Sequence, residues 1–463
     1  MRLLHSASRT HAHFDDPHLV SCAGLVPVMR LAQAAGLPAL VAALVRMGSS
    51  VGCNPAGKVS SIVAGMVAGA ECIDDLDVIR HGGMAALFDD CYAPSTLGSF
   101  LRAFTFGQVR QLGAAARRFL INLVGMTPLL PGAETVTYVD VDSLLRRVYG
   151  HAKQGAGFGH AKLGGYSALL RGLSPLIATL STPLAAPVIA AVRLRGGSAG
   201  SARGAASLVA EALVTARQLG AAGLVLLRAD SAYYTAKVIT AARRAGAQFS
   251  ITIPACRSVR AAIAAISDEA WTPIRYPGAI WDDQGQCWIS DAEVAETTYT
   301  AFAGTRQAIT TRLVVRRVRT PNPTGQAELL AGFRYHAFVT DTTLSTVDAD
   351  RTHRAHAVIE QVFAELIDGP LAHLPSGHFA ANAAWLTCAA IAHNLTRAAA
   401  TLTDRSGARA RGATLRRQII NVAARLAHRA HGIDLHLPEH WPWATRWQLL
   451  FQASCRLPPI AGT

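Results

Sequence analysis

The sequence predicts an α/β protein in which a mixed sheet is flanked by helices, with a helical region before the sheet and a β-rich stretch inserted into it. Three observations support this prediction. Between residues 14 and 129, apolar residues recur at three- and four-residue intervals, which is typical of helices. At Thr135 the pattern changes to the alternation of strands. Short strands then alternate with helices as far as Ile253.

The composition indicates a folded protein with a polyanionic partner. Hydrophobic residues make up 51% of the 463 residues and charged residues 16%, which excludes a disordered chain. This length corresponds to roughly two to four domains. The net charge of +14 favours nucleic acid first and a membrane surface second, because each cation that neutralises a phosphate releases a bound counterion.

No membrane or export signal stands out. The uncharged stretch 173–192 is interrupted by prolines and fits two short buried strands better than one spanning helix. The first residues reach polar side chains before any long apolar run, so we expect a cytoplasmic protein. The eight cysteines include no C-x-x-C pair, so we expect reduced, mostly buried thiols rather than a zinc module or a disulfide framework.

The N-terminal region, residues 1–130, is expected to be all-helical. Helical spacing covers residues 26–46 and 60–70, and a further helix over 97–104 has Ser95 or Thr96 as its N-cap. One function of such a region is to bind DNA ends, and the alternative is a plain supporting domain. No helix-turn-helix motif decides between them.

The core begins at the β-branched, alternating run 136–142. Two short strands are expected over 166–170 and 187–194, then a helix over 201–219 and a strand over 224–227 that leads to Asp230. A helix over 235–245 and a strand over 249–253 follow. Three strands, a helix, a strand, a helix and a strand form the order expected of an RNase H-like mixed-sheet core.

Later segments complete the predicted organisation. Strands over 295–302 and 309–318 indicate a β-rich insertion, and helical spacing returns over 350–366 and 380–402. The arginine-rich stretch 397–429 is expected to form a solvated helical face that follows phosphates. The predicted regions are a helical N-terminal domain (1–130), the first part of the core (131–255), the insertion (256–345), the second part of the core (346–400) and a helical basic C-terminal region (401–463).

Acidic residues stand at two strand ends of the predicted core. Asp140 and Asp142 lie two residues apart on one strand, so their side chains share a face, and Asp230 ends a later apolar strand. In this order of elements the two strands are neighbours, so the carboxylates can meet. Carboxylates that converge from separate segments are what two-metal phosphoryl transfer requires. A turn or cap role is the alternative for each aspartate alone.

Glu360 is the candidate third acid. It shares one helical face with His353, His356 and Ile367, among apolar residues where an uncompensated carboxylate is costly to bury. A surface glutamate on an amphipathic helix is the plain alternative. A rival interpretation makes His353, His356 and Glu360 a transition-metal triad.

Five motif blocks and two shorter N-terminal segments follow one another along the chain. The blocks are Asp140-Val-Asp-Ser, Tyr149-Gly-His-Ala-Lys-Gln-Gly-Ala-Gly-Phe-Gly159, Arg228-Ala-Asp-Ser-Ala-Tyr-Tyr234, His353-Arg-Ala-His-Ala-Val-Ile-Glu-Gln361 and Leu374-Pro-Ser-Gly-His-Phe-Ala-Ala-Asn-Ala-Ala-Trp-Leu386, preceded by Asp74-Asp-Leu-Asp-Val-Ile-Arg and Pro94-Ser-Thr. In this order they resemble the motifs of bacterial insertion-sequence transposases of the IS-thirteen-eighty group. The resemblance covers nearly the whole chain.

The resemblance implies a DDE transposase of the RNase H-like superfamily that moves a DNA element by cutting and pasting. The implied catalytic and metal-binding acids are Asp142, Asp230 and Glu360, with Asp140 as an alternative or additional ligand. The implied cofactor is a pair of Mg²⁺ ions, for which Mn²⁺ can substitute. The implied partners are double-stranded DNA, as terminal inverted repeats and target, and a second copy in a homodimeric complex.

One departure from the related pattern concerns DNA contacts. Related transposases often carry Lys where this chain has Ile367, so a phosphate contact is missing, and Arg354 or the arginine-rich tail is a candidate to replace it. A decayed, non-catalytic DNA-binding protein and an RNase H-like nuclease without transposition remain alternatives. The candidate nucleic-acid contacts are Lys153 and Lys162 beside a glycine-rich loop, His353, Arg354, His356, Arg409, Arg411, Arg416, Arg417 and Trp288.

Overall fold

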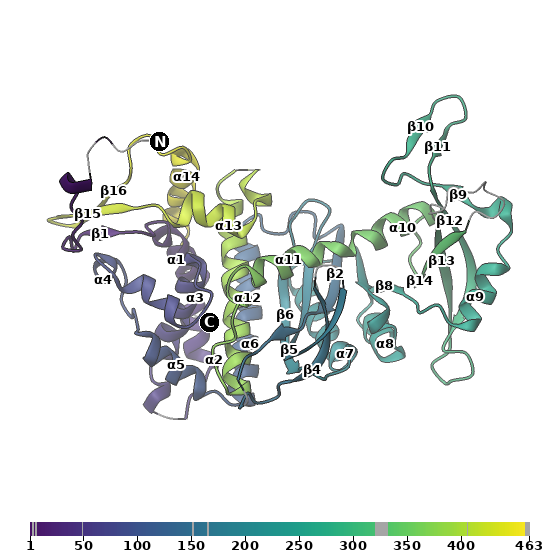
Figure 1. Cartoon of the computed structure of the whole chain (residues 1–463), viewed down its shortest axis with the longest axis horizontal. Coiled ribbons are helices and arrows are strands. Elements are labelled where there is room, and N and C mark those ends of the chain that lie inside the picture. The colour runs from purple at the N-terminus through teal and green to yellow at the C-terminus, as the bar shows by residue number, and fades with distance from the viewer. Residues whose placement is uncertain are drawn as a thin grey trace.

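The computed structural model describes residues 1, 4, 7–48, 50–150, 152–163, 166–319, 332–404 and 406–458. The molecule is elongated (Figure 1): helices from both ends of the sequence lie at one end, the central sheet follows, and strands from the predicted insertion lie at the other end.

The N-terminal region contains the predicted helices with different boundaries; the helix expected over 60–70, for example, spans Pro55–Ala68. The expected helix over 26–46 is divided at Gly36, whose φ of 80° is left-handed. The helix expected from Leu97 begins at Pro94 instead, with Ala93 as N-cap, because proline fits the first helical turn, where no backbone N–H is needed. The helices are α1 (Leu25–Ala34), α2 (Leu37–Leu44), α3 (Pro55–Ala68), α4 (Met84–Leu87), α5 (Pro94–Arg102) and α6 (Phe106–Met126).

The central sheet contains the predicted order of strands and helices. Strand β2 pairs antiparallel with β5 and parallel with β7, and β7 pairs parallel with β8. The glycine-rich run 155–159, expected as a flexible loop, already belongs to a strand from Gly157 onward and pairs with β5, so that prediction was wrong. The strands are β2 (Val136–Ser143), β3 (Arg146–Arg147), β4 (Gly157–Leu163), β5 (Tyr166–Ser181), β6 (Val188–Gly196), β7 (Leu224–Ala229) and β8 (Gln248–Thr252), with helices α7 (Ala205–Gln218) and α8 (Ala236–Arg244) before and after β7.

The uncharged stretch 173–192 falls within β5 and β6, as its prolines predicted. In the described ranges, no single helix is long and apolar enough to cross a membrane, although the bent pair α1 and α2 meets the length and composition criteria together.

The β-rich insertion is present, but its long strands continue the core sheet instead of forming a separate one. Strand β14 pairs with β8, and β13 and β12 follow outward. The short β10–β11 hairpin projects from this end of the molecule (Figure 1). The elements are α9 (Arg257–Ala264), β9 (Thr272–Pro273), β10 (Ile280–Asp282), β11 (Cys287–Ile289), β12 (Ala292–Ala301), β13 (Ile309–Arg319) and β14 (Phe333–Thr340).

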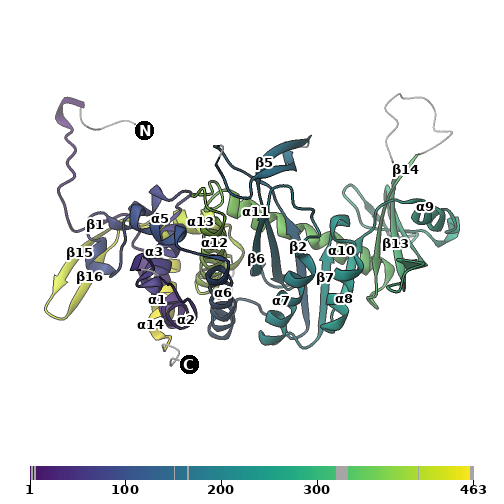
Figure 2. The same ribbon diagram turned by 90° about the horizontal axis from the view of Figure 1, so that it is seen from below.

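The segment that carries Glu360 returns from the insertion to the core on the face of the sheet opposite α7 and α8 (Figure 2). One continuous helix was expected here. Instead, α10 (Thr346–Arg354) and α11 (Val358–Ile367) are separated by a 3₁₀ turn, η6 (Ala355–Ala357). The segment therefore narrows to a 3₁₀ turn between His353 and Glu360 while its backbone stays in the right-handed helical region.

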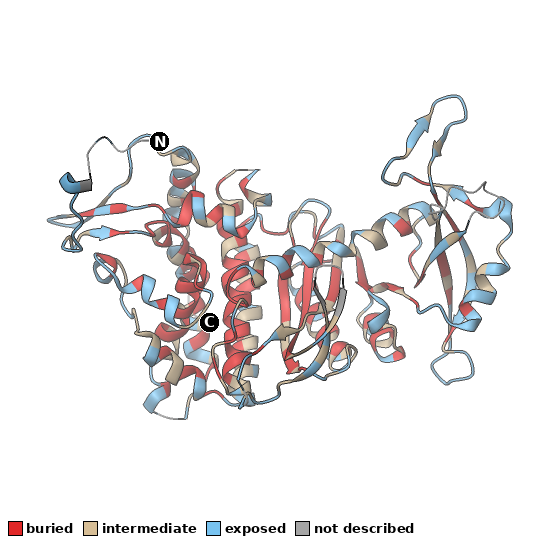
Figure 3. Cartoon of the chain, in the orientation of Figure 1, coloured by how far each residue is buried: buried red, intermediate tan, exposed pale blue. Residues whose placement is uncertain are grey.

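Helix α12 (Phe379–Thr401) forms the centre of the helical half (Figure 3). Its alanine-rich sequence is apolar around most of its circumference, and such a helix is stable only when surrounded by other elements. It packs against α3, α6 and β6. The buried Asn394 side chain accepts a hydrogen bond from the Ile189 amide and donates one to the Ile189 carbonyl, both at 2.8 Å, so it pairs with β6 as a strand would.

The C-terminal region is not wholly helical and the N-terminal region is not all-α, which corrects both expectations. Strand β15 pairs with β16 on one side and with β1 (Leu19–Val20) on the other, while α13 and α14 are the α-helices of this region. The C-terminal elements are α13 (Gly412–Leu415), β15 (Ala424–Arg429), β16 (Gly432–His436) and α14 (Ala444–Arg456). All eight cysteines are free, but Cys53, Cys256, Cys287 and Cys455 are exposed, so the thiols are not mostly buried.

Candidate active site

Two of the predicted acids stand at matching ends of neighbouring parallel strands. The β2–β7 register pairs Asp140 with Arg228 and Val141 with Ala229. Asp230 follows the last residue of β7 in an extended conformation, with φ of −78° and ψ of 179°, so it continues this register opposite Asp142. Neighbouring strands lie about 4.8 Å apart, and residues opposite each other on parallel strands face the same side. The two carboxylates therefore belong to one edge of the sheet.

The environment of Asp142 disfavours its negative charge. The pKa of this carboxyl is raised to about 6, chiefly by burial and in addition by the charges of Asp230 and Glu360. The Ser143 amide, which donates a hydrogen bond of 2.6 Å to Asp142, and the charge of His356 act in the opposite direction. Both other acids are thus close enough to repel Asp142.

Asp230 and Glu360 are both exposed. Asp230 is the N-cap of a short 3₁₀ turn and accepts a hydrogen bond of 2.9 Å from the Ala232 amide. Glu360 lies on the exposed side of α11, whereas Ile359 and Val362 are buried against the core. Of the two interpretations of Glu360, the structure therefore agrees with a surface position on an amphipathic helix and not with a buried acid on an apolar face.

Asp140 is fully buried, and its carboxylate is occupied by other side chains. Arg228 donates to both oxygens at 2.7 Å, and His356 Nδ1 lies 3.1 Å from Oδ1. Burial alone raises the pKa of Asp140, but the charge of Arg228 and the hydrogen bonds outweigh it, so the pKa falls below its ordinary value. Asp140 is a partner of Arg228, and this favours Asp142 as the first acid.

Among the described residues, no group of three or more His, Cys, Asp or Glu side chains is close enough to hold a metal ion as it stands. The rival triad of His353, His356 and Glu360 has a further obstacle, because Asp140 occupies His356 Nδ1. The His353 ring nitrogens lie 2.8 Å from Ser250 Oγ and 3.0 Å from Thr252 Oγ1.

The comparison with known protein families covers nearly the whole chain. Residues 4–459 match the family described as transposase DDE domain group 1. The chain belongs to this family. Such proteins form a nuclease and transposase class that acts on DNA and generally uses divalent metal ions. No curated protein shows significant similarity to the chain.

Members of this DDE family act on DNA, but three of the side chains predicted to contact DNA are held by other groups of the protein. The geometry argues against a DNA contact by His353, because this half-buried residue of α10 stacks its ring on Phe338 at 4.1 Å and has both ring nitrogens next to hydroxyl groups of Ser250 and Thr252. His356 is held by Asp140. Arg354 Nε donates to Asp350 at 2.8 Å, which leaves only part of its guanidinium for phosphate.

Lys153 and Lys162 are the two lysines predicted to contact DNA phosphates. Lys153 Nζ donates to the Ser376 carbonyl at 3.1 Å, which ties its segment to the residues before α12 and leaves two of its three N–H groups for other acceptors. Lys162 lies in β4, and its side chain is outside the described residues.

The arginine-rich tail does not form one solvated helical face. Arg397 is buried and donates to the carbonyls of Ala408 and Ala410, and Arg416 is half-buried with a donor 3.4 Å from the Asp368 carbonyl. Of the tail arginines predicted to contact DNA, Arg409, Arg411 and Arg417 are exposed.

Trp288 lies in the β10–β11 hairpin. Its ring meets Trp281 edge-on at 5.1 Å, and the Arg275 guanidinium lies 5.6 Å from the ring centre. Trp271, in contrast, is buried in the core, so packing explains it.

Sequence reasoning missed Arg228, although a signal was present. A charged residue inside the apolar run Leu-Val-Leu-Leu-Arg-Ala must be paired if the strand is buried, because an isolated buried charge is very costly. Asp140, on a strand predicted to be its neighbour, was the available partner.

Proposed function

We propose that this chain is a cut-and-paste DNA transposase of the insertion-sequence group that it resembles, with an RNase H-like core. Water would attack a phosphodiester at the element end, and the freed 3′ hydroxyl would then attack target DNA, without a covalent protein intermediate. The observation that carries this proposal is the β2–β7 register, which brings Asp142 and Asp230 to one sheet edge within charge range of Glu360.

The three carboxylates suit divalent cations. Hard cations such as Mg²⁺ prefer carboxylate oxygens, and three acids that repel one another lose that repulsion when a cation joins them. Asp142, Asp230 and Glu360 would hold two Mg²⁺ ions, with Mn²⁺ as a substitute, and the ions would activate the attacking oxygen and stabilise the leaving one. Because Asp230 and Glu360 are exposed, their side chains can draw together at small cost.

Other residues of the chain would bind and orient the DNA. The exposed Arg409, Arg411 and Arg417 would contact the phosphates of double-stranded terminal repeats and target DNA. Trp288 would stack on a base near the cleavage site. A homodimer would bring the two element ends together.

The test uses the purified full-length chain with its own element ends and Mg²⁺ or Mn²⁺. We expect metal-dependent nicking and strand joining, and loss of both in Asp230→Asn while DNA binding remains. Glu365→Gln is the matched control, because this acid lies on α11 like Glu360 but faces His393 and Arg397. Ends that are bound but never cut would refute the catalytic proposal.

That negative outcome would favour a second candidate, a decayed transposase that only binds DNA. Ile367 motivates this candidate, because related enzymes often carry Lys at this position. Ile367 has no charge to offer a phosphate and packs against the core.

A further inference from the structure

We propose that Asp140 and Arg228 are positioning residues that fix the three acid-bearing segments relative to one another, a role that rests on the proposed metal-dependent function. Neither residue is proposed to touch metal or DNA. They would act through β2, β7 and the α10–α11 segment, which carry Asp142, Asp230 and Glu360.

The pair is dry and geometrically well matched. Arg228 is 1% exposed and Asp140 is 0% exposed. Two guanidinium nitrogens, Nε and Nη2, each donate to a different carboxylate oxygen at 2.7 Å. This bidentate arrangement restricts both distance and orientation, unlike a contact through a single point charge. It therefore fixes the relative placement of β2 and β7 beyond their backbone pairing.

The same two side chains also reach the third segment. Arg228 Nη1 donates to the Thr352 carbonyl at 2.9 Å, near the end of α10, and Asp140 Oδ1 contacts His356 Nδ1 at 3.1 Å in η6. The Tyr138 ring lies 4.1 Å from the Arg228 guanidinium carbon and completes the enclosure. Both contacts fall at or beside the 3₁₀ turn that links α10 to α11, the helix that carries Glu360.

The positions along the chain explain why this matters for the acids. Asp140 stands two residues before Asp142, and Arg228 stands two residues before Asp230. His356 stands one helical turn before Glu360. The buried pair of Asp140 and Arg228 thus contacts β2, β7 and the α10–α11 segment, each close to the acid that the segment carries.

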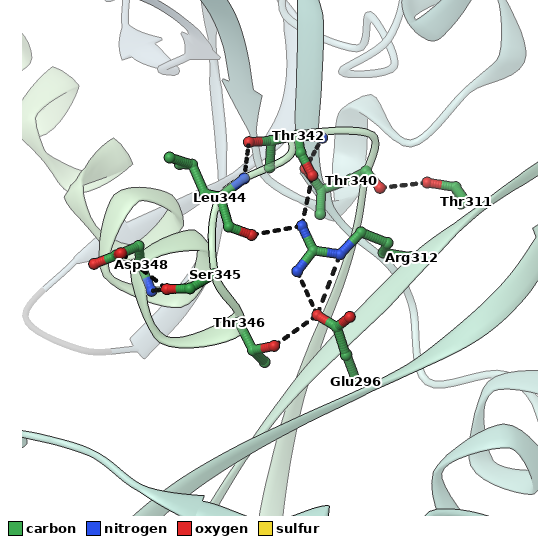
Figure 4. A network of polar contacts seen from close by, with 9 residues as sticks. All are labelled: Glu296, Thr311, Arg312, Thr340, Thr342, Leu344, Ser345, Thr346 and Asp348. Atoms are coloured by element: carbon green, nitrogen blue, oxygen red, sulfur yellow. Dashed lines mark hydrogen bonds and ion pairs between the residues drawn. The ribbon is translucent and has the colours of Figure 1, made fainter.

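The far end of α10 is anchored independently. Arg312 on β13 donates to the carbonyls of Thr342 and Leu344 and pairs with Glu296, which also accepts a hydrogen bond from Thr346 (Figure 4). The start of α10 is thus fixed to the insertion, while its end, which leads into the helix of Glu360, is held by Arg228 and Asp140 together with the contacts of His353.

Stability alone does not account for such a pair. A buried ion pair replaced by apolar residues of similar volume often leaves a protein equally stable, whereas removal of one partner leaves an unpaired buried charge. This contrast separates a positioning role from a structural one. The double variant Asp140→Leu/Arg228→Met should restore the stability lost in Arg228→Met but should not restore the contacts with Thr352 and His356.

The experiment measures Mn²⁺ affinity by electron paramagnetic resonance and thermal unfolding on the full-length chain. We expect the double variant to unfold near the wild-type temperature and to bind Mn²⁺ about tenfold or more weakly. The matched control is Arg193→Met/Glu211→Leu, an arginine–carboxylate pair of 2.7 Å between β6 and α7, which should keep wild-type affinity. Wild-type Mn²⁺ affinity in the stable double variant would overturn the positioning role.

Two further variants keep the outcomes separate. If the double variant does not fold, Arg228→Lys replaces it, because lysine keeps the charge but cannot make the bidentate contact and reach Thr352 together. Weakened Mn²⁺ binding in Arg228→Lys supports the proposal, and unchanged binding overturns it. Glu360→Gln tests the proposed function itself: if the wild type binds no Mn²⁺, or Glu360→Gln binds it equally well, the metal site fails and the positioning role fails with it.

Discussion

Asn394 offers a direct test of how the helical half is joined to the sheet. Its amide is 3% exposed and makes two hydrogen bonds of 2.8 Å, one to the N–H and one to the C=O of Ile189 on β6. Asn394→Leu keeps a similar volume but leaves both backbone groups without these partners. Each unsatisfied buried group costs about 1–3 kcal/mol, so the variant should lose about 2–6 kcal/mol of unfolding free energy.

The assay is urea unfolding of the full-length chain, followed by circular dichroism. Thr396→Val on the same helix is the matched control, because its hydroxyl donates only to the Ala392 carbonyl at 2.8 Å, one turn earlier in the helix. The control should lose about 1 kcal/mol or less. If Asn394→Leu shifts the unfolding midpoint no more than Thr396→Val, the reasoning that Asn394 pairs with the sheet edge is wrong.

Three other predictions concern pH, metal and salt. Burial lowers the pKa of His353 to about 3, so between about pH 6.5 and 3 the unfolded state binds a proton that the folded state does not. The contribution of this residue to the unfolding free energy is complete above about pH 6.5 and falls by about 1.4 kcal/mol per pH unit below it. In urea unfolding at pH 7, 6 and 5, the unfolding free energy of His353→Gln should therefore decline less steeply than that of the wild type. Mn²⁺ at about 100 times its dissociation constant should stabilise the wild type by about 2.7 kcal/mol in thermal unfolding, and Asp230→Asn should lose most of this gain. Arg409→Ala and Arg411→Ala should each weaken DNA binding equally for all sequences and reduce the slope of log affinity against log salt by about 1; sequence-dependent losses in a titration would contradict simple phosphate contacts.

The parts of the fold that follow from local pattern could be predicted from the sequence. The alternating run before Asp142 and the apolar run before Asp230 identify β2 and β7, and the order of elements predicts that the two strands are neighbours. Position at a strand end was enough to select both acids as candidates. Glu360 was selected by its motif, while its exposure depended on packing that the helical pattern alone did not reveal.

Features that depend on contacts between distant segments could not be predicted. The commitment of Asp140 to Arg228 depends on side-chain choice across two strands, which spacing does not specify. The 3₁₀ turn before α11 lies in a sequence without Gly or Pro, so no local signal marks it. Strand β15 was taken for a helix because its arginines suit either structure, and its pairing with β1 is set by tertiary contacts.

The pairing of β1 with β15 has a consequence for synthesis of the protein. Asp16, shortly before β1, and Arg425, within β15, are 409 residues apart in sequence and form an ion pair. At ribosomal rates of about 5–20 residues per second, β15 is synthesised roughly 20–80 seconds after β1. During that time the edge of β1 and the surface of α1 that contacts α14 stay uncovered. Truncated gene copies should therefore yield chains that aggregate or are degraded. Such chains would not persist as DNA-binding competitors of the full-length protein.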